Sequence, residues 1–270
     1  MHLYRTSNGP VLKRSDAFLL LSDHWDQLII RDDLPSYLAT VQGEPTSAPE
    51  APLSPCTSQE VWAAGVTYFR SRTARMEESK DAGGGSFYDR VYAAERPEIF
   101  FKATPQRVAA PGAAMHLRRD SKWMVPEPEM TLVISAGGKL IGTTVGNDLS
   151  CRDIEGENPL YLPQAKCFRL SAALGPCIRV SAEPLSSETA IHLQILRSGV
   201  TAFEGQTTLA QLKRTPAELI AFLYRDNDFP QGAFLMTGTG IVPPDDFTLQ
   251  PGDEVRISID DIGTLSNLMA

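Results

Sequence analysis

The sequence has few cysteines, few histidines and no excess of basic side chains. The four cysteines (Cys56, Cys151, Cys167 and Cys177) form no CxxC pair, and nothing in the sequence indicates an oxidising compartment. We therefore predict four reduced thiols with structural roles. The formal net charge of −8 argues against a nucleic-acid-binding protein, because such proteins present a basic surface to phosphate groups. An acidic chain of this kind is compatible with a bound cation.

Long apolar runs are also missing. The N-terminal residues lack the apolar segment of a secretory signal peptide. The most apolar stretch near them, "AFLLLSDHWDQLII", is short and is interrupted by Asp23, His24 and Asp26, so it cannot span a bilayer. These absences predict a cytoplasmic protein with no membrane partner.

The composition is that of an ordinary globular protein. A hydrophobic fraction of 42% in 270 residues is enough to bury a sizeable core without disulfide bonds. Residues 1 to 40 read as a small, partly β region, and residues 46–59 are rich in Pro, Ser and Ala, which indicates a linker or a crossing loop. We expect a small N-terminal domain with its linker over residues 1–55 and a larger domain over residues 56–270.

Strand-forming segments dominate the chain from Glu98 onward. Gly-centred turns separate several of these segments, which are "EIFFKA", "TLVISAGGKLIGTTVGND", "IRVSA", "IHLQILRSGVTAFEGQT", "FLMTGTG" and "DEVRISIDDIGTLSN". One helix is expected in "TPAELIAFLYRD", where Thr215 is the N-cap, Pro216 the first helical residue and Glu218 the third. The pattern predicts a β-dominated α+β fold.

Two glutamates stand one residue apart in "KWMVPEPEMTLVIS" (122–135), at the entry to an apolar strand. Because side chains alternate faces along a strand, Glu127 and Glu129 should project to the same side. Pro126 and Pro128 favour extended geometry in the residues that precede them. Two adjacent carboxylates repel each other unless a cation lies between them or one carboxylate is protonated. A divalent metal meets this need, although two solvated glutamates at a strand entry are an alternative interpretation.

A third carboxylate is expected to join this pair. Asp148 ends the next strand, in "GTTVGNDLSCRD", and a turn at Ala136-Gly137-Gly138 would make the two strands an antiparallel hairpin. The hairpin would return Asp148 to a position near Glu127 and Glu129. Three carboxylates suit a hard cation such as Mg²⁺, with Mn²⁺ or Ca²⁺ as alternatives.

Several segments together resemble the fumarylacetoacetate hydrolase family. These segments are "GVTYFRSRTARMEE", "EIFFKA", "VPEPEMTLVIS", "IGTTVGNDLSCRDIE", "AKCFRLSAALGPCI", "MTGTGIVPP" and "LQPGDEVRISIDDIGTLSN", and the resemblance as a whole spans roughly residues 61–267. The resemblance implies a mixed β-sandwich roll for the catalytic domain, over residues 56–270 here. It also implies a homodimer or a dimer of dimers, and a small-molecule 2-oxo acid as substrate.

The resemblance also implies roles for individual residues. Glu127, Glu129 and Asp148 match the family's metal ligands. Lys166 matches a lysine that faces the substrate, and Thr239 matches a small polar residue that helps to hold the substrate carboxylate. A surface lysine and an ordinary glycine-rich turn are the alternative interpretations for these last two residues.

One departure from the family pattern bears on the reaction. Hydrolytic members often carry "GxNYxxHxxE", in which the histidine activates water, whereas Ser71 stands at that position here. Because serine cannot accept a proton near neutral pH as imidazole does, cleavage of a C–C bond by water is disfavoured. The sequence is more similar to the branch that dehydrates 2-keto-3-deoxy-pentonates, where a glutamate matching Glu98 lies beside the metal. Arg70, Ser71 and Arg72 are then candidate substrate contacts.

The resulting expectation is a metal-dependent lyase that removes water from a 2-keto-3-deoxy sugar acid such as 2-keto-3-deoxy-arabinonate or -xylonate. Lys166 and Glu98 are the candidate catalytic residues, Lys166 as the base at C3 and Glu98 as the acid at the C4 hydroxyl, or with these roles exchanged. Three alternatives remain open on sequence grounds. They are an acylpyruvate-type hydrolase or oxaloacetate decarboxylase, a non-catalytic metal-binding relative, and a calcium-stabilised structural domain.

Overall fold

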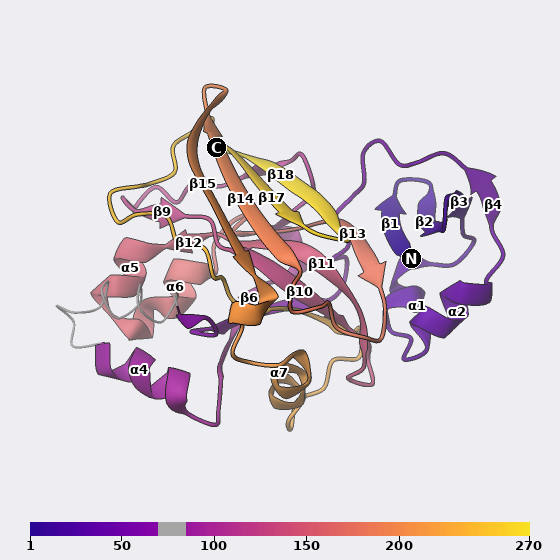
Figure 1. Ribbon diagram of the computed structural model, residues 1–270, viewed down its shortest axis with the longest axis horizontal. Helices are drawn as coiled ribbons and strands as arrows, with labels where there is room; N and C mark the ends of the chain where they lie inside the picture. Colours follow the sequence, from indigo (N-terminus) through magenta and orange to yellow (C-terminus); the bar gives the residue numbers. More distant parts are fainter. Residues whose placement is uncertain (70–84) are drawn as a thin grey trace.

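The computed structural model describes residues 1–69 and 85–270, and strands dominate this part of the chain (Figure 1). A large mixed sheet has the strand order β4-β3-β2-β1-β13-β11-β10-β16-β5-β6, and β7 pairs with β13 outside that path. Its strands are β1 (His2–Thr6), β2 (Gly9–Arg14), β3 (Ala17–Leu20), β4 (Glu44–Thr46), β5 (Glu60–Gly65), β6 (Glu98–Ala103), β7 (Val108–Ala109), β10 (Pro128–Ile134), β11 (Leu140–Asp148), β13 (Ala172–Val180) and β16 (Ala233–Met236).

A second sheet stacks on the centre of the first one (Figure 1). Its order is β15-β14-β17-β18-β8, and its strands are β8 (Ala114–Met115), β14 (Ala190–Arg197), β15 (Val200–Thr208), β17 (Glu254–Ile259) and β18 (Gly263–Met269). A short pair, β9 (Met124–Val125) and β12 (Ser150–Cys151), lies beside the site described below. The described α-helices are α1 (Trp25–Ile29), α2 (Leu34–Thr40), α4 (Gly85–Ala93), α5 (Arg152–Glu157), α6 (Leu162–Lys166) and α7 (Pro216–Leu223).

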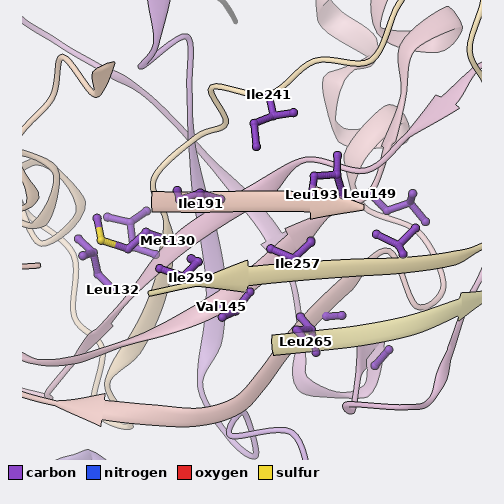
Figure 2. Packing of buried hydrophobic residues seen from close by; sticks show 14 of the residues in the cluster. Met130, Leu132, Val145, Leu149, Ile191, Leu193, Ile241, Ile257, Ile259 and Leu265 are labelled. Atoms are coloured by element: carbon purple, nitrogen blue, oxygen red, sulfur yellow. The ribbon is translucent and has the colours of Figure 1, made fainter. Parts of the chain in front are cut away.

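Every residue of β10 is buried, because alternate side chains point to opposite faces of the strand and each face packs in a core. Met130, Leu132 and Ile134 face the core between the two sheets, whereas Val133 belongs to the core on the other face. Figure 2 shows the first of these cores, in which Met130, Leu132 and Val145 meet apolar residues of the second sheet such as Ile191 and Ile257. We estimate that truncating Leu132 to alanine costs about 2–5 kcal/mol of stability.

The N-terminal strands continue the large sheet. β1 pairs antiparallel with β13, placing Leu3 opposite Ile178. Side chains of α1 and α2, including Leu28 and Leu38, pack in the same core as Val133 of β10. The first 55 residues therefore contribute strands to the same sheet that carries the site. Their assignment as a separate domain stays a prediction.

The local predictions for this part of the chain agree with the structure. The β-dominated α+β class is confirmed, and so is the hairpin of β10 and β11. The α7 helix begins at Pro216, and the Thr215 hydroxyl accepts a hydrogen bond from the backbone N–H of Glu218. All four cysteines are free. Among the described residues, no helix combines the length and the apolar character needed to cross a membrane.

Candidate metal centre

The hairpin of β10 and β11 brings the predicted carboxylates to one end of the large sheet. Pro128 lies opposite Asn147 in the antiparallel register, and the backbone N–H of Asp148 donates to the carbonyl of Glu127 at 3.0 Å. This backbone bond holds the first glutamate and the aspartate side by side. Glu129, two residues further along β10, faces the same space, as the period of a strand requires.

The three carboxylates are buried and close together. Glu127, Glu129 and Asp148 are 4%, 1% and 1% exposed, which rules out two solvated glutamates at a strand entry. One carboxylate oxygen from each residue lies within 4.8 Å of those from the other two. An all-oxygen set of this kind is the donor chemistry that Mg²⁺, Mn²⁺ and Ca²⁺ prefer. The arrangement can therefore hold such an ion, although the assignment of these residues as its ligands stays a prediction.

The pKa of Glu129 shows how strongly the three carboxylates disfavour one another's ionisation. Its burial, together with the negative charges of Asp148 and Glu127, holds the pKa of the Glu129 carboxyl well above its ordinary value of 4.5. Lys166 and a hydrogen bond from the Gly238 backbone act in the opposite direction. A divalent cation among these oxygens would add positive charge beside the Glu129 carboxyl and would favour its ionised form.

Each carboxylate has one oxygen held by a donor from another segment. Arg152 Nη2 lies 2.8 Å from Glu127 Oε1, and Lys102 Nζ lies 2.6 Å from Asp148 Oδ1. The backbone N–H of Gly238 donates to Glu129 Oε2 at 2.6 Å. These contacts fix the orientation of each carboxylate from outside the cluster, which is a recurring arrangement around protein metal sites.

Lys166 lies inside the cluster and is fully buried. It ends α6, and its Nζ lies 2.5 Å from Glu127 Oε2, 3.3 Å from Asp148 Oδ2 and 2.6 Å from Ser150 Oγ. The interpretation of Lys166 as a surface lysine is thereby excluded, since the side chain is only 1% exposed. An ammonium group here contacts the same two carboxylates that would hold a metal.

Glu98 begins β6, opposite Gly65 of β5. Its carboxylate lies directly over the Gly65 backbone, where any larger residue would collide with it. Gly65 in turn lines a cavity of about 10 Å³ that is bordered by the three carboxylates, Lys166 and Thr239. Glu98 is therefore beside the site, as the sequence predicted, and its role as a catalytic group stays a prediction.

Thr239 is buried on the same cavity, and its hydroxyl exchanges hydrogen bonds with the backbone of Ile241. The remaining predicted substrate contacts, Arg70, Ser71 and Arg72, lie outside the described residues, so their positions relative to the cavity are not addressed. The structure thus brings six of the nine predicted site residues together.

Two buried cations of the site were not predicted. Lys102 and Arg152 stand inside the quoted segments "EIFFKA" and "NDLSCRD", but no role was assigned to either of them. A signal for Lys102 was present, because a lysine among strand-forming apolar residues is expected either at an edge or with a buried partner. Arg152 follows Asp148 by four residues, and its position depends on the turn between β11 and α5.

Comparison with known proteins shows what this chain is similar to. A family model described as "Fumarylacetoacetate (FAA) hydrolase C-terminal" matches residues 61–270. The chain is 46% identical over 215 residues to a protein of Haloferax volcanii named "Probable 2-keto-3-deoxyxylonate dehydratase", covering 79% of this chain and 73% of that one. It is 45% identical over 215 residues to "2-dehydro-3-deoxy-D-arabinonate dehydratase" of Saccharolobus solfataricus, covering 78% and 72%.

A solved structure is similar over the whole chain. It is described as "2-keto-3-deoxy-D-arabinonate dehydratase complexed with magnesium and 2,5-dioxopentanoate". The TM-score is 0.86 at 34% sequence identity, and the match covers 100% of this chain and 98% of that one. The mixed sheets described above thus have a counterpart in a protein that was solved with a divalent metal.

Proposed function

Because the chain belongs to the fumarylacetoacetate hydrolase family, we propose that it is a Mg²⁺-dependent dehydratase of 2-keto-3-deoxy sugar acids. Its substrates would be compounds such as 2-keto-3-deoxy-arabinonate or -xylonate. The observation that carries the proposal is the buried group of Glu127, Glu129 and Asp148 in a chain so similar to two dehydratases.

The three carboxylates would hold the metal ion. Mg²⁺ fits best with the similar solved structure that is described as a complex with magnesium, and Mn²⁺ or Ca²⁺ suits the same oxygen donors. When bound, the ion supplies a Lewis acid that lowers the energy of negative charge on the 2-oxo group of the substrate. The outer contacts from Arg152, Lys102 and Gly238 keep the carboxylates oriented before the substrate arrives.

The reaction requires two proton movements at the substrate before tautomerisation. A base removes a proton from C3, and the electron pair forms the C3–C4 double bond as the C4 hydroxyl leaves. An acid donates a proton to that hydroxyl, so that water departs. Loss of a proton from C5 with protonation at C3 converts the unsaturated product into a C4–C5 enol. Loss of the enol hydroxyl proton with protonation at C4 then gives the aldehyde of a 2,5-dioxo acid, so that the overall change is the loss of one water.

Lys166 and Glu98 are the residues proposed for these proton transfers. Lys166 lines the cavity beside the carboxylates, and Glu98, on the end strand β6 of the same sheet, lies over Gly65, which borders the cavity. We assign Lys166 Nζ to the C3 proton and a Glu98 carboxyl oxygen to the C4 hydroxyl, with the exchanged assignment as the alternative. Groups in such positions contribute about 10²–10⁴-fold each.

The remaining proposed contacts would fix the substrate. Thr239 borders the cavity, and we assign it to the substrate carboxylate. Arg70, Ser71 and Arg72 supply cationic and hydroxyl groups for the substrate hydroxyls or carboxylate, on the evidence of their sequence positions alone.

A substrate panel tests this function. Purified protein is assayed with Mg²⁺ against 2-keto-3-deoxy-D-arabinonate, 2-keto-3-deoxy-xylonate, an acylpyruvate and oxaloacetate. We expect turnover of a deoxy sugar acid, with formation of an aldehyde acid. Preferential cleavage of the acylpyruvate or decarboxylation of oxaloacetate would instead favour the hydrolase or decarboxylase alternative. Metal binding without turnover of any of the four compounds would favour a non-catalytic relative.

The proposal extends to assembly and location. We propose a homodimer or a dimer of dimers, supported by the family resemblance and by exposed apolar side chains on the second sheet, Val200 at 70% and Leu268 at 50%. Light scattering on the purified protein would distinguish these states from a monomer. A cytoplasmic location likewise stays a proposal, to be checked by fractionation.

A further inference from the structure

Lys102 is a fully buried lysine in the interior of β6. A strand residue at such a position is normally apolar, because removing an ammonium group from water costs several kcal/mol unless its charge is compensated. A charged lysine at this position must therefore be compensated by nearby acceptors or negative charges.

The ammonium group of Lys102 has three partners, all from the candidate metal centre. Its Nζ lies 2.6 Å from Asp148 Oδ1, donates to the carbonyl of Leu149 at 3.0 Å and donates to the carbonyl of Lys166 at 2.6 Å. The two carbonyl contacts are hydrogen bonds, and the contact with Asp148 is an ion pair. They join the end of β11 to the end of α6, the two segments that supply Asp148 and Lys166.

The strand pairing places Lys102 in an irregular position. Along β6, Phe101 lies opposite Trp62 and Ala103 lies opposite Val61, so that the register skips Lys102. An extra residue of this kind bends a strand and redirects side chains, and such bulges are common beside active sites. The bulge thus accompanies the turn of Lys102 toward Asp148.

From these contacts we propose that Lys102 is a positioning residue, which fixes the carboxylate of Asp148 and the backbone of Lys166 for metal binding. This inference rests on the proposed metal-dependent function of the same site. Lys102 acts through other residues and makes no contact with the reacting atoms. It holds the outer oxygen of Asp148, and so leaves Oδ2 turned toward the centre of the cluster, where Lys166 now meets it at 3.3 Å.

The two buried lysines differ in what they hold. Two of the three oxygen partners of Lys102 are backbone carbonyls, whose positions are set by the course of the chain and not by a side-chain rotamer. Within the described part of the chain, the hydrogen bonds of Lys166 go to side chains, those of Glu127, Asp148 and Ser150, and side chains can change rotamer when a cation enters. Lys102 is therefore the fixed cation of the pair, and Lys166 the exchangeable one.

The test compares Mn²⁺ affinity, measured by titration calorimetry, in four forms of the full-length protein. These are the wild type, Lys102→Met, Lys102→Arg and the control Lys139→Met. Lys139 is an exposed lysine next to the opposite end of β11 from Asp148. We expect Lys102→Met to weaken Mn²⁺ binding by about 10–100-fold, Lys102→Arg to weaken it less, and the control to match the wild type.

Thermal melts of the metal-free proteins separate positioning from a general loss of stability. A purely structural lysine would lower the melting temperature and leave the Mn²⁺ affinity of the folded protein unchanged, and that result would overturn the proposal. If Lys102→Met does not fold, Lys102→Arg decides the matter, and wild-type affinity in that variant would likewise overturn it. Since Mn²⁺ binding does not depend on the reaction, a wild type that binds Mn²⁺ but dehydrates no sugar acid would contradict the proposed function alone.

Discussion

Two hollows of this protein differ in size and in chemistry. The cavity at the end of β10 and β11 measures only about 10 Å³, and buried carboxylates and a buried lysine line it. The groove on the outer face of the second sheet measures about 700 Å³, and exposed side chains such as His192, Gln206 and Arg256 line it. Exposed groups in water need no partner, whereas a buried charge persists only where something compensates it. We therefore place the chemistry in the small cavity, on the basis of desolvated charge and not of volume.

The largest effect is expected from the carboxylates of the small cavity. Glu127→Gln and Asp148→Asn each remove one negative charge and one anionic oxygen donor from a set of three. We predict loss of measurable Mn²⁺ binding in calorimetry and loss of turnover. Wild-type activity in either variant would show that the ion, if one is used, binds elsewhere.

The next largest effect concerns the two proposed proton-transfer groups. Glu98→Gln and Lys166→Ala should lower kcat by about 10²–10⁴-fold, because each removes a group that donates or accepts a proton in the transition state. Both variants should still bind Mn²⁺, since neither residue is a proposed ligand. The control is the Mn²⁺ affinity of each variant, measured by calorimetry in parallel. If a variant loses both metal binding and activity, the substituted residue is needed to form the metal site, and the proposed role in proton transfer is wrong.

A stability effect that depends on pH is expected from Glu129 in the metal-free protein. Burial and the charges of Asp148 and Glu127 raise the pKa of this carboxyl above its ordinary value of 4.5. The folded protein thus keeps a proton that the unfolded chain has already released, so that Glu129 makes the fold less stable as the pH rises above that value. Glu129→Gln removes this penalty.

Urea denaturation at pH 5.5 and at pH 7 measures the difference. In the absence of metal, the free energy of unfolding of Glu129→Gln should exceed that of the wild type by more at pH 7 than at pH 5.5. The gain is at most about 1.4 kcal/mol per pH unit. An equal difference at both pH values would mean that Glu129 titrates at its ordinary pKa in the folded protein.

The smallest effect is expected in the large groove. The double substitution His192→Ala with Gln206→Ala alters two exposed side chains of the second sheet, so that turnover should stay within about twofold of the wild type. The stability should change by no more than about 0.5 kcal/mol per substitution. A large loss of turnover in this variant would indicate that the groove, and not the small cavity, takes part in the reaction.

The sequence was informative wherever local rules decide the structure. The prolines and the alternating apolar residues of β10, the glycine turn after it and the cap at Thr215 each depend on a few neighbouring residues, and each was predicted correctly. The convergence of Asp148 on Glu127 followed from the same hairpin. The family resemblance added Glu98, Lys166 and Thr239, which composition and periodicity do not identify.

Local sequence patterns do not predict contacts between segments that are far apart in the chain. Nothing local indicates that β1 pairs with β13, or that β16 runs parallel to β5. Lys102 is 46 residues from Asp148 in the chain, and its burial depends on how β6, β11 and α6 meet. The apolar neighbours of Lys102 indicate either an edge position or a buried partner, and the sequence alone does not decide between them, which explains why Lys102 and Arg152 were missed.

The most direct test of the central claim is the consumption of 2-keto-3-deoxy-D-arabinonate by the wild-type protein and by Asp148→Asn, prepared in parallel. Each protein is assayed after chelation of divalent metal and again after Mg²⁺ is restored. We expect the wild type to lose turnover on chelation and to regain it with Mg²⁺, yielding 2,5-dioxopentanoate, and we expect Asp148→Asn to be inactive in both conditions. Turnover of this acid that is unaffected by chelation, or undiminished in Asp148→Asn, would contradict this expectation.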